Sequence, residues 1–212
     1  MKSQITYSSD GKSLIKICRS ETECANELHV YNLGLDFTPK LLNKIDEKTI
    51  EISYIKGNSL KDEIDFDFSK PAEQLAKLHK STIKEGIVLC HLDNNPRNYL
   101  IEKETGKFYL IDFSESGYSL PENDLVNFLL FWAAILPPNR FQNAMQRFLE
   151  GYKSPELLDN KRQRSHFSQW INVFDVRRRK YCKNPGTKFA WQIDNRKYLL
   201  TNFYTLVRSD KK

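Results

Sequence analysis

The sequence contains no long hydrophobic run. Its longest uninterrupted apolar stretch is Phe128–Leu136, which is far shorter than the roughly 20 apolar residues that a membrane-spanning helix requires. Its first residues, MKSQITYSSDGK, also lack the apolar segment of a secretory signal peptide. These absences argue against an integral membrane protein or an exported protein, so we expect a cytoplasmic location.

Cysteine is scarce as well, with four residues in the chain: Cys18, Cys24, Cys90 and Cys182. No two of them form a C-x-x-C pair. In a chain without an export signal, scattered cysteines of this kind favour reduced thiols over disulfides. We therefore expect all four as thiols.

Charge is plentiful but unevenly distributed. The chain has 33 Lys and Arg against 27 Asp and Glu, a formal net charge of +6. Residues 161–212 contain 14 Lys and Arg and three acidic residues, a net charge of +11, so the first 160 residues carry a net charge of −5. Two interpretations of the basic end stay open. It is either a solvated surface of helices or a docking face for a phosphorylated substrate, an anionic membrane surface or nucleic acid.

The N-terminal segment predicts a β-hairpin over Ile5–Cys18. Asp10 and Gly11 supply the residues that tolerate a positive φ, as a tight hairpin turn requires. In the second strand of this hairpin, alternation separates two faces. One face carries Leu14, Lys16 and Cys18, and the other carries Ile15 and Ile17.

One helix and two further strands are predicted next. Ser20–Glu23 has the spacing of a capping box, so a helix is expected over Glu23–Leu33, with Gly34 just beyond its end. Strands are expected at Thr38–Leu42 and Thr49–Ile55.

The remainder of the chain is mostly helical in pattern, with one short hairpin. From Pro71 onward apolar residues recur at helical spacing, except where Tyr99–Ile101 and Phe108–Ile111 form two apolar strands joined by a polar turn. Polar loops stand at both ends of this hairpin, at Asp93–Asn98 and Asp112–Ser116.

Composition and pattern together predict an α+β fold. Apolar residues make up 40% of the chain and aromatic residues 12%, which is enough for a core and excludes extensive disorder. A strand-rich segment followed by a helical one favours two lobes, at residues 1–57 and 58–212.

The two polar loops carry the chemistry, because both end on the same side of the predicted hairpin. The first contains Asp93 and Asn98, and the second contains Asp112. Carboxylate and carboxamide oxygens suit a hard cation such as Mg²⁺. A further carboxylate can orient a hydroxyl nucleophile, so the set contains the parts that phosphoryl transfer requires.

These residues resemble the motifs of the protein-kinase-like superfamily. His91, Asp93 and Asn98 match the H-x-D-x-x-x-x-N catalytic loop, and Asp112-Phe113-Ser114 stands in place of Asp-Phe-Gly. The resemblance implies that Asp93 is the catalytic base and that Asn98 and Asp112 hold Mg²⁺. It extends over about residues 1–136.

The same resemblance implies a nucleotide site in the N-terminal lobe. Lys16 would pair with the α- and β-phosphates of ATP, and Glu27 would hold Lys16 by an ion pair. Glu21 and Glu23 compete with Glu27 for that role, which the sequence leaves open.

Further along the chain, the resemblance makes Ile50–Gly57 the last strand and the hinge, with adenine read near Ser53 and Ile55. Asp124 matches the helix aspartate that braces the catalytic loop. The apolar stretch Phe128–Leu136 would then be a buried helix of the large lobe.

Three departures from the family pattern narrow the interpretation. No Gly-rich phosphate-covering loop precedes Lys16, which implies a truncated N-lobe. Ser114 replaces the glycine of Asp-Phe-Gly. Only 11 residues separate Asp112 from Asp124, and no Ala-Pro-Glu follows. A long activation segment cannot fit, which argues against an ordinary eukaryotic-type protein kinase.

The short link instead resembles the atypical branches of the superfamily. These include the aminoglycoside and choline phosphotransferases, the lipopolysaccharide-core sugar kinases, and the RIO-type and KEOPS-complex kinases. Compact size and the segment Leu110–Ser114 resemble the lipopolysaccharide-core kinases most. That branch acts at the inner face of the membrane, where the basic end would meet anionic lipid.

The sequence thus predicts an ATP- and Mg²⁺-dependent phosphotransferase that acts on a hydroxyl of a sugar, a glycolipid or another small molecule. Two alternatives stay open: an atypical bacterial protein Ser/Thr kinase, and a pseudokinase that binds a partner through its basic end. No RNA-binding motif is recognisable, so nucleic acid is the less favoured partner.

Overall fold

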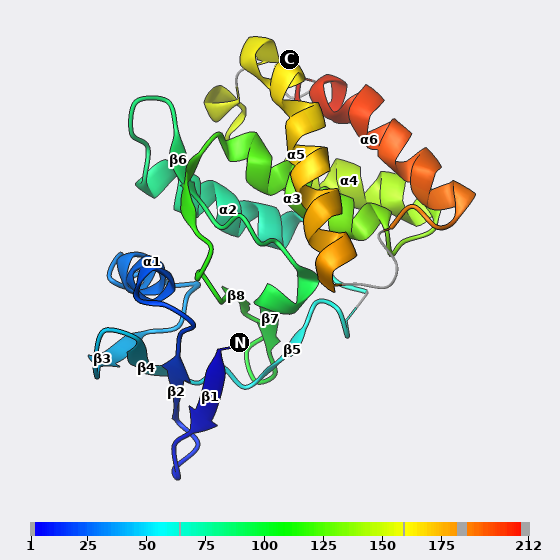
Figure 1. Ribbon diagram of the computed structural model, residues 1–212. Helices are drawn as coiled ribbons and strands as arrows, with labels where there is room; N and C mark the ends of the chain where they lie inside the picture. The colour runs from blue at the N-terminus through cyan, green and yellow to red at the C-terminus, as the bar shows by residue number, and fades with distance from the viewer. Residues whose placement is uncertain (1–2, 64, 159, 182–185, 209–212) are drawn as a thin grey trace. The chain divides into compact units, whose positions relative to one another are not determined.

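Strands and helices are segregated along the chain, as the sequence predicts (Figure 1). The computed structural model describes residues 3–63, 65–158, 160–181 and 186–208. Its N-terminal part consists mainly of short strands and its C-terminal part of long helices, so the α+β class is confirmed.

The chain divides into two compact units. The first comprises Met1–Phe66 and Pro96–Gly117, and the second comprises Asp67–Asn95 and Tyr118–Lys212. The hairpin that follows the first polar loop thus groups with the N-terminal strands. The lobe boundary between residues 57 and 58 stays a prediction.

The first unit contains an antiparallel sheet in the order β1 (Gln4–Tyr7), β2 (Ser13–Ile17), β4 (Thr49–Ser53) and β3 (Leu41–Lys44). The predicted hairpin is β1–β2, but its turn is wider than expected, because Tyr7 pairs with Leu14. The Ser8 hydroxyl donates to Asp10 at 2.6 Å and closes the loop, in which Gly11 has a φ of +66°.

The third strand in sequence starts later than predicted. Thr38 donates both its N–H and its hydroxyl to the carbonyl of Leu35, at 3.2 and 3.0 Å, which makes a turn there instead of a strand. β3 therefore begins at Leu41.

Helix α1 (Glu21–Tyr31) follows the predicted capping signal. The Ser20 hydroxyl accepts the N–H of Glu23 at 3.2 Å, so the helix starts two residues earlier than expected. Gly34 stands just beyond the helix with a φ of +63°, a conformation that glycine adopts without steric cost.

A second sheet completes the first unit, in the order β5 (Gly57–Ser59), β7 (Tyr99–Glu102) and β8 (Phe108–Leu110). β7 and β8 are the predicted short hairpin. Beyond the last ladder pair, the N–H of Ile111 donates to the carbonyl of Asn98 at 2.9 Å. This bond holds the start of one polar loop against the end of the other.

The second unit consists mainly of helices: α2 (Ser69–Ser81), α3 (Pro121–Ala133), α4 (Pro138–Tyr152), α5 (Asn160–Tyr181) and α6 (Ala190–Arg208). A two-stranded sheet of β6 (Val88–Cys90) and β9 (Gly117–Ser119) precedes α3. α3 is buried along most of its length, but it ends at Ala133, so the last residues of the predicted buried helix Phe128–Leu136 lie beyond it and Ile135 is exposed. Within α3, Phe128 stacks on Phe148 of α4 with ring centroids 4.3 Å apart.

The basic C-terminal part is attached to α3 by buried amides. Asn195 of α6 donates to the carbonyls of Ala133 and Leu136 at 3.0 and 2.8 Å, and Gln192 donates to Ala134 at 2.8 Å. These bonds satisfy carbonyls that the end of α3 leaves without helical partners. α6 is therefore a structural helix of this unit.

The structure bears on two of the sequence observations, the lack of a long apolar run and the scattered cysteines. Among the described residues, no helix combines the length and apolarity needed to cross a bilayer. Cys18, Cys24 and Cys90 are buried free thiols, and Cys182 lies outside the described residues.

Candidate active site

A buried lysine lies at the centre of the first unit. The ammonium of Lys16 on β2 contacts Glu27 of α1 at 2.5 Å and Asp112 at 2.7 Å. Lys16 is 5% exposed and Glu27 is fully buried. The structure thereby chooses among the three candidate glutamates, since Glu23 instead pairs with Arg19 at 2.6 Å.

The charge of this lysine is fixed by its two partners. Burial alone would lower the pKa of Lys16, but the carboxylates of Glu27 and Asp112 raise it above its usual value. Burial also raises the pKa of Glu27, and the nearby ammonium of Lys16 opposes this rise. Lys16 is therefore a permanent cation held in one position.

Asp112 is held in an unusual backbone conformation. Its φ is +63°, which an aspartate tolerates better than most residues. Ser114 donates its hydroxyl to Asp112 at 3.1 Å, and the carbonyl of Ser114 accepts from Asn26 at 3.0 Å. The serine that replaces glycine in this motif thus fixes the carboxylate.

Phe113 anchors the same motif. Its side chain is fully buried and meets the ring of Tyr31 edge-on at 5.8 Å. The residue before Asp112 is also constrained, because Ile111 donates its N–H to the carbonyl of Asn98. Asn98 is buried and Asp112 is half exposed, and both carry the oxygen ligands that suit Mg²⁺. The donor set therefore fits the expected ion.

The predicted adenine-binding residues lie on β4 and just after it. The register pairs Ser53 with Ser13, on the face of the sheet opposite Lys16. The Ser53 hydroxyl accepts the N–H of Lys40 at 2.9 Å, and Ile55 is buried. Their roles in binding adenine stay predictions.

Apolar side chains share the sheet face of Lys16. Ile5 is directly opposite Lys16 in the register, and Tyr7 is opposite Leu14. Ile5 and Tyr7 are 52% and 59% exposed, which is unusual for large apolar side chains beside a buried ion pair.

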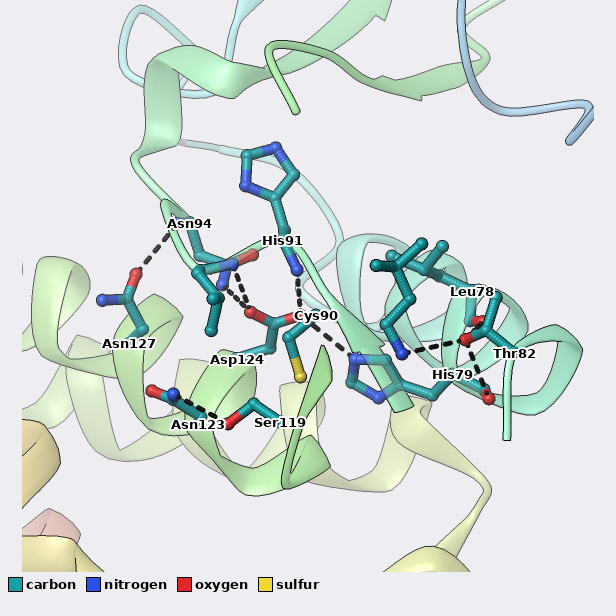
Figure 2. Close-up of polar contacts among 12 residues, drawn as sticks. Leu78, His79, Thr82, Cys90, His91, Asn94, Ser119, Asn123, Asp124 and Asn127 are labelled. Atoms are coloured by element: carbon teal, nitrogen blue, oxygen red, sulfur yellow. Dashed lines mark hydrogen bonds and ion pairs between the residues drawn. The ribbon is translucent and has the colours of Figure 1, made fainter. Parts of the chain in front are cut away.

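The second unit holds the predicted catalytic loop, and Asp124 of α3 binds its backbone (Figure 2). Asp124 accepts the N–H of His91 at 2.7 Å and that of Leu92 at 2.8 Å. It also accepts from the side chain of Asn94 at 2.7 Å. The bracing role that the resemblance implied for Asp124 thus corresponds to three direct bonds to the loop.

One further residue of this arrangement was not expected from the sequence. Asn127 accepts the N–H of Asn94 at 2.9 Å (Figure 2). It lies one turn after Asp124 on α3, so the spacing of these two residues was a signal that could have been used. His91, which belongs to the expected motif, is fully buried and accepts the N–H of Asp93 at 3.3 Å, so it holds the loop from within.

His79 of α2 supports Asp124 from behind the loop. Its Nε2 lies 3.1 Å from Asp124 and its Nδ1 lies 2.8 Å from the Tyr152 hydroxyl. A carboxylate can only accept, so Nε2 carries the proton and Nδ1 accepts from Tyr152. The ligand atoms of His79, Cys90 and Asp124 lie within 4.8 Å of one another. Cys90 donates to the carbonyl of Leu120 and Asp124 already accepts four donors, so this cluster is a hydrogen-bonded core.

Kinases and phosphotransferases are among the solved structures with a similar fold. A choline kinase from Cryptosporidium parvum superposes with a TM-score of 0.65 at 11% identity, covering 99% of this chain and 90% of that chain. Choline kinase LicA from Streptococcus pneumoniae gives 0.56 at 15% identity, with 96% and 90% covered. The aminoglycoside phosphotransferase APH(2″)-IIa, in its ternary complex with streptomycin and ATP, gives 0.55 at 12% identity, with 82% and 81% covered.

The fold is therefore that of the protein-kinase-like phosphotransferases. The family model for choline/ethanolamine kinase matches residues 14–174. The chain belongs to this family and is a kinase. No curated protein sequence matches the chain significantly. The choline phosphotransferases are one of the branches that the sequence suggested, whereas the resemblance to lipopolysaccharide-core kinases stays a prediction.

Proposed function

We propose that the chain transfers the γ-phosphate of ATP to the hydroxyl of a small alcohol, with choline and ethanolamine as the first candidates. The observation that carries this proposal is the contact of Lys16 with both Glu27 and Asp112. Two carboxylates, 11 and 96 positions away from Lys16 in the sequence, converge on this one buried cation. A cation held there by two carboxylates is suited to bind phosphate oxygens.

The nucleotide would be bound by the first unit. Lys16 binds the α- and β-phosphates, and Glu27 keeps its ammonium in position. Asn98 and Asp112 would hold Mg²⁺, which neutralises phosphate charge when it is bound. The exposed Ile5 and Tyr7, on the sheet face of Lys16, offer an apolar surface for the adenine ring.

The acceptor would be activated by Asp93. The acceptor oxygen attacks the γ-phosphorus, the bond to the bridging oxygen of ADP breaks, and the hydroxyl proton passes to the Asp93 carboxylate. Phosphorylated alcohol and ADP are the products. Asp93 is half exposed, in a loop whose backbone is held by Asp124.

A sugar or a glycolipid acceptor would use the same chemistry and stays in the proposal as the finer alternative. Its support is the basic C-terminal part, which could meet an anionic surface. Part of that charge already has internal partners. Arg196 forms two bonds with Asp175 at 2.6 and 3.0 Å, and the Arg178 guanidinium lies 5.3 Å from the ring of Phe131. We therefore rank a small soluble alcohol first.

The test is phosphate transfer from labelled ATP to a panel of choline, ethanolamine, an aminoglycoside, simple sugars, a lipopolysaccharide-core glycolipid and a protein substrate. We expect labelled product with an amino alcohol. Label on the protein alone would instead favour a protein kinase. A companion experiment measures the melting temperature with excess ATP and Mg²⁺. A nucleotide at about 100 times its Kd stabilises the folded state by about 2.7 kcal/mol, so an unchanged melting temperature would refute the proposal.

Glu27→Gln tests the nucleotide site directly. The substitution removes the charge that holds Lys16, so we expect the Kd for ATP to rise about tenfold, or about 1.4 kcal/mol. Glu23→Gln is the matched control, because it makes the same change on the same helix in a residue that pairs with Arg19. Isothermal titration measures both, and equal losses in the two variants would contradict the assignment.

A further inference from the structure

We propose that Arg177, in the basic segment Val176–Lys180 of α5, positions the catalytic loop and is not part of an anion-docking surface. The Nη1 of Arg177 donates to the carbonyl of Leu92 at 2.9 Å. Leu92 is the residue immediately before Asp93. The inference rests on the proposed function only in so far as Asp93 is the catalytic base.

The conformation of Leu92 requires support from its surroundings. Its φ is +62°, in the left-handed region that costs a residue with a Cβ about 1 kcal/mol or more. Strained backbone of this kind persists only where neighbouring groups fix it. The N–H of Leu92 donates to Asp124 at 2.8 Å, and its carbonyl accepts from Arg177.

These two bonds hold Leu92 from opposite ends. Asp124 fixes the peptide that precedes Leu92, whereas Arg177 fixes the peptide that joins Leu92 to Asp93. Without Arg177 that second peptide would lose its tertiary donor at the carbonyl, and the direction in which the Asp93 side chain leaves the backbone would be less well defined. A small error in the orientation of a catalytic base is sufficient to slow a reaction strongly.

The helix that carries Arg177 is itself well anchored. Phe174 is buried and meets Phe131 of α3 at 4.9 Å between ring centroids. Asp175 pairs with Arg196 of α6. Arg177 therefore projects from a fixed helix. It also lies three residues beyond the segment that the family model matches, which ends at residue 174.

The decisive comparison is between two neighbouring arginines. Arg177→Met keeps an unbranched apolar stem and removes the guanidinium donors, whereas Arg179→Met removes the same charge from an exposed position on the same helix. We expect Arg177→Met to lower kcat at least tenfold with the KM for ATP unchanged, and Arg179→Met to leave both constants unchanged. Arg177→Lys retains a donor and should restore part of kcat.

Hydrogen exchange supplies a readout that does not need activity. In Arg177→Met the backbone amides of residues 91–94 should exchange faster than in the wild type, whereas the amides of α3 should not change. Arg179→Met should resemble the wild type in both segments.

The possible outcomes separate the two proposals. If the wild type transfers phosphate and both arginine variants lose activity equally, the basic segment acts through its charge and the inference about Arg177 is wrong. If the wild type transfers no phosphate to any acceptor, the proposed function fails, and unchanged exchange at residues 91–94 would then refute the positioning role as well. Faster exchange there in Arg177→Met alone would support it.

Discussion

Asp93→Asn is expected to lower kcat about 1,000-fold, because the amide cannot accept the proton of the acceptor hydroxyl, and general bases contribute 10²- to 10⁴-fold. The Kd for ATP should change little, since the nucleotide would be bound by Lys16 and its partners in the first unit. The measurement combines steady-state kinetics with the best acceptor from the panel and titration with ATP.

The matched control for this prediction is Asp194→Asn, which makes the same change at an exposed carboxylate of α6. That variant should have the kinetics of the wild type. Turnover within threefold of the wild type in Asp93→Asn would remove Asp93 from the mechanism. A loss confined to ATP binding would assign it to the nucleotide site.

Asp124→Ala is expected to be the most destabilising of the substitutions considered for this chain. Asp124 is fully buried and accepts from His79, His91, Leu92 and Asn94. Removing the carboxylate leaves these buried donors without an acceptor, which costs about 3–5 kcal/mol when a buried charged partner is lost. Because small domains have only about 5–15 kcal/mol of stability, much of the variant is expected to be unfolded at 37 °C. Urea denaturation measures the difference.

Asp124→Asn keeps the prediction testable if the alanine variant does not fold. The amide retains one acceptor oxygen, so the loss should be smaller than for alanine but larger than for Asn123→Ala, the adjacent residue of α3. Asn123 is a suitable control because its side chain bonds only weakly to Ser119, at 3.2 Å. Equal stability of the three variants would contradict the bracing role.

The stability of the wild type should also depend on the charge of Asp124. Burial by itself would raise the pKa of this carboxyl, but the hydrogen bond from His79, electrostatic interactions with His79 and His91, and the N–H of Leu92 lower the pKa below its usual value. A depressed folded pKa contributes stability that is present above the unfolded pKa of about 3.9 and is lost as the pH falls through the folded value. Urea denaturation between pH 6 and 2.5 should therefore show a smaller acid loss in Asp124→Asn than in the wild type.

Local patterns in the sequence predicted the class of the protein. The kinase class was identified from the spacing of His91, Asp93 and Asn98 and from the position of Asp112. These residues lie in the two loops that flank the hairpin of β7 and β8. The capping signal at Ser20 located the start of α1 to within two residues. Such features depend on neighbours within a few positions, which the sequence displays directly.

Contacts between distant segments were harder to predict from the sequence. Glu21 and Glu23 competed with the expected Glu27 as partners for Lys16, and only the packing of α1 against the sheet selects Glu27. Asn127 and Arg177 belong to no motif near the loop that they hold. Likewise, the wide β1–β2 turn depends on the side chains of Ser8 and Asp10 rather than on the Asp-Gly pair alone.

The sequence by itself determined the α+β class and the kinase-like motifs of this chain, because hydrophobic periodicity and short motifs are local properties. Only the tertiary structure decided which carboxylates share the ammonium of Lys16 and how the left-handed Leu92 is held. It also decided how part of the basic C-terminal segment is used. In the sequence alone, Arg177 and Arg179 are two equivalent charges of one basic segment. In the fold one donates to the backbone beside Asp93 and the other is exposed to solvent. That difference arises from the rotation of α5 about its own axis, which the packing of α5 against α3 fixes.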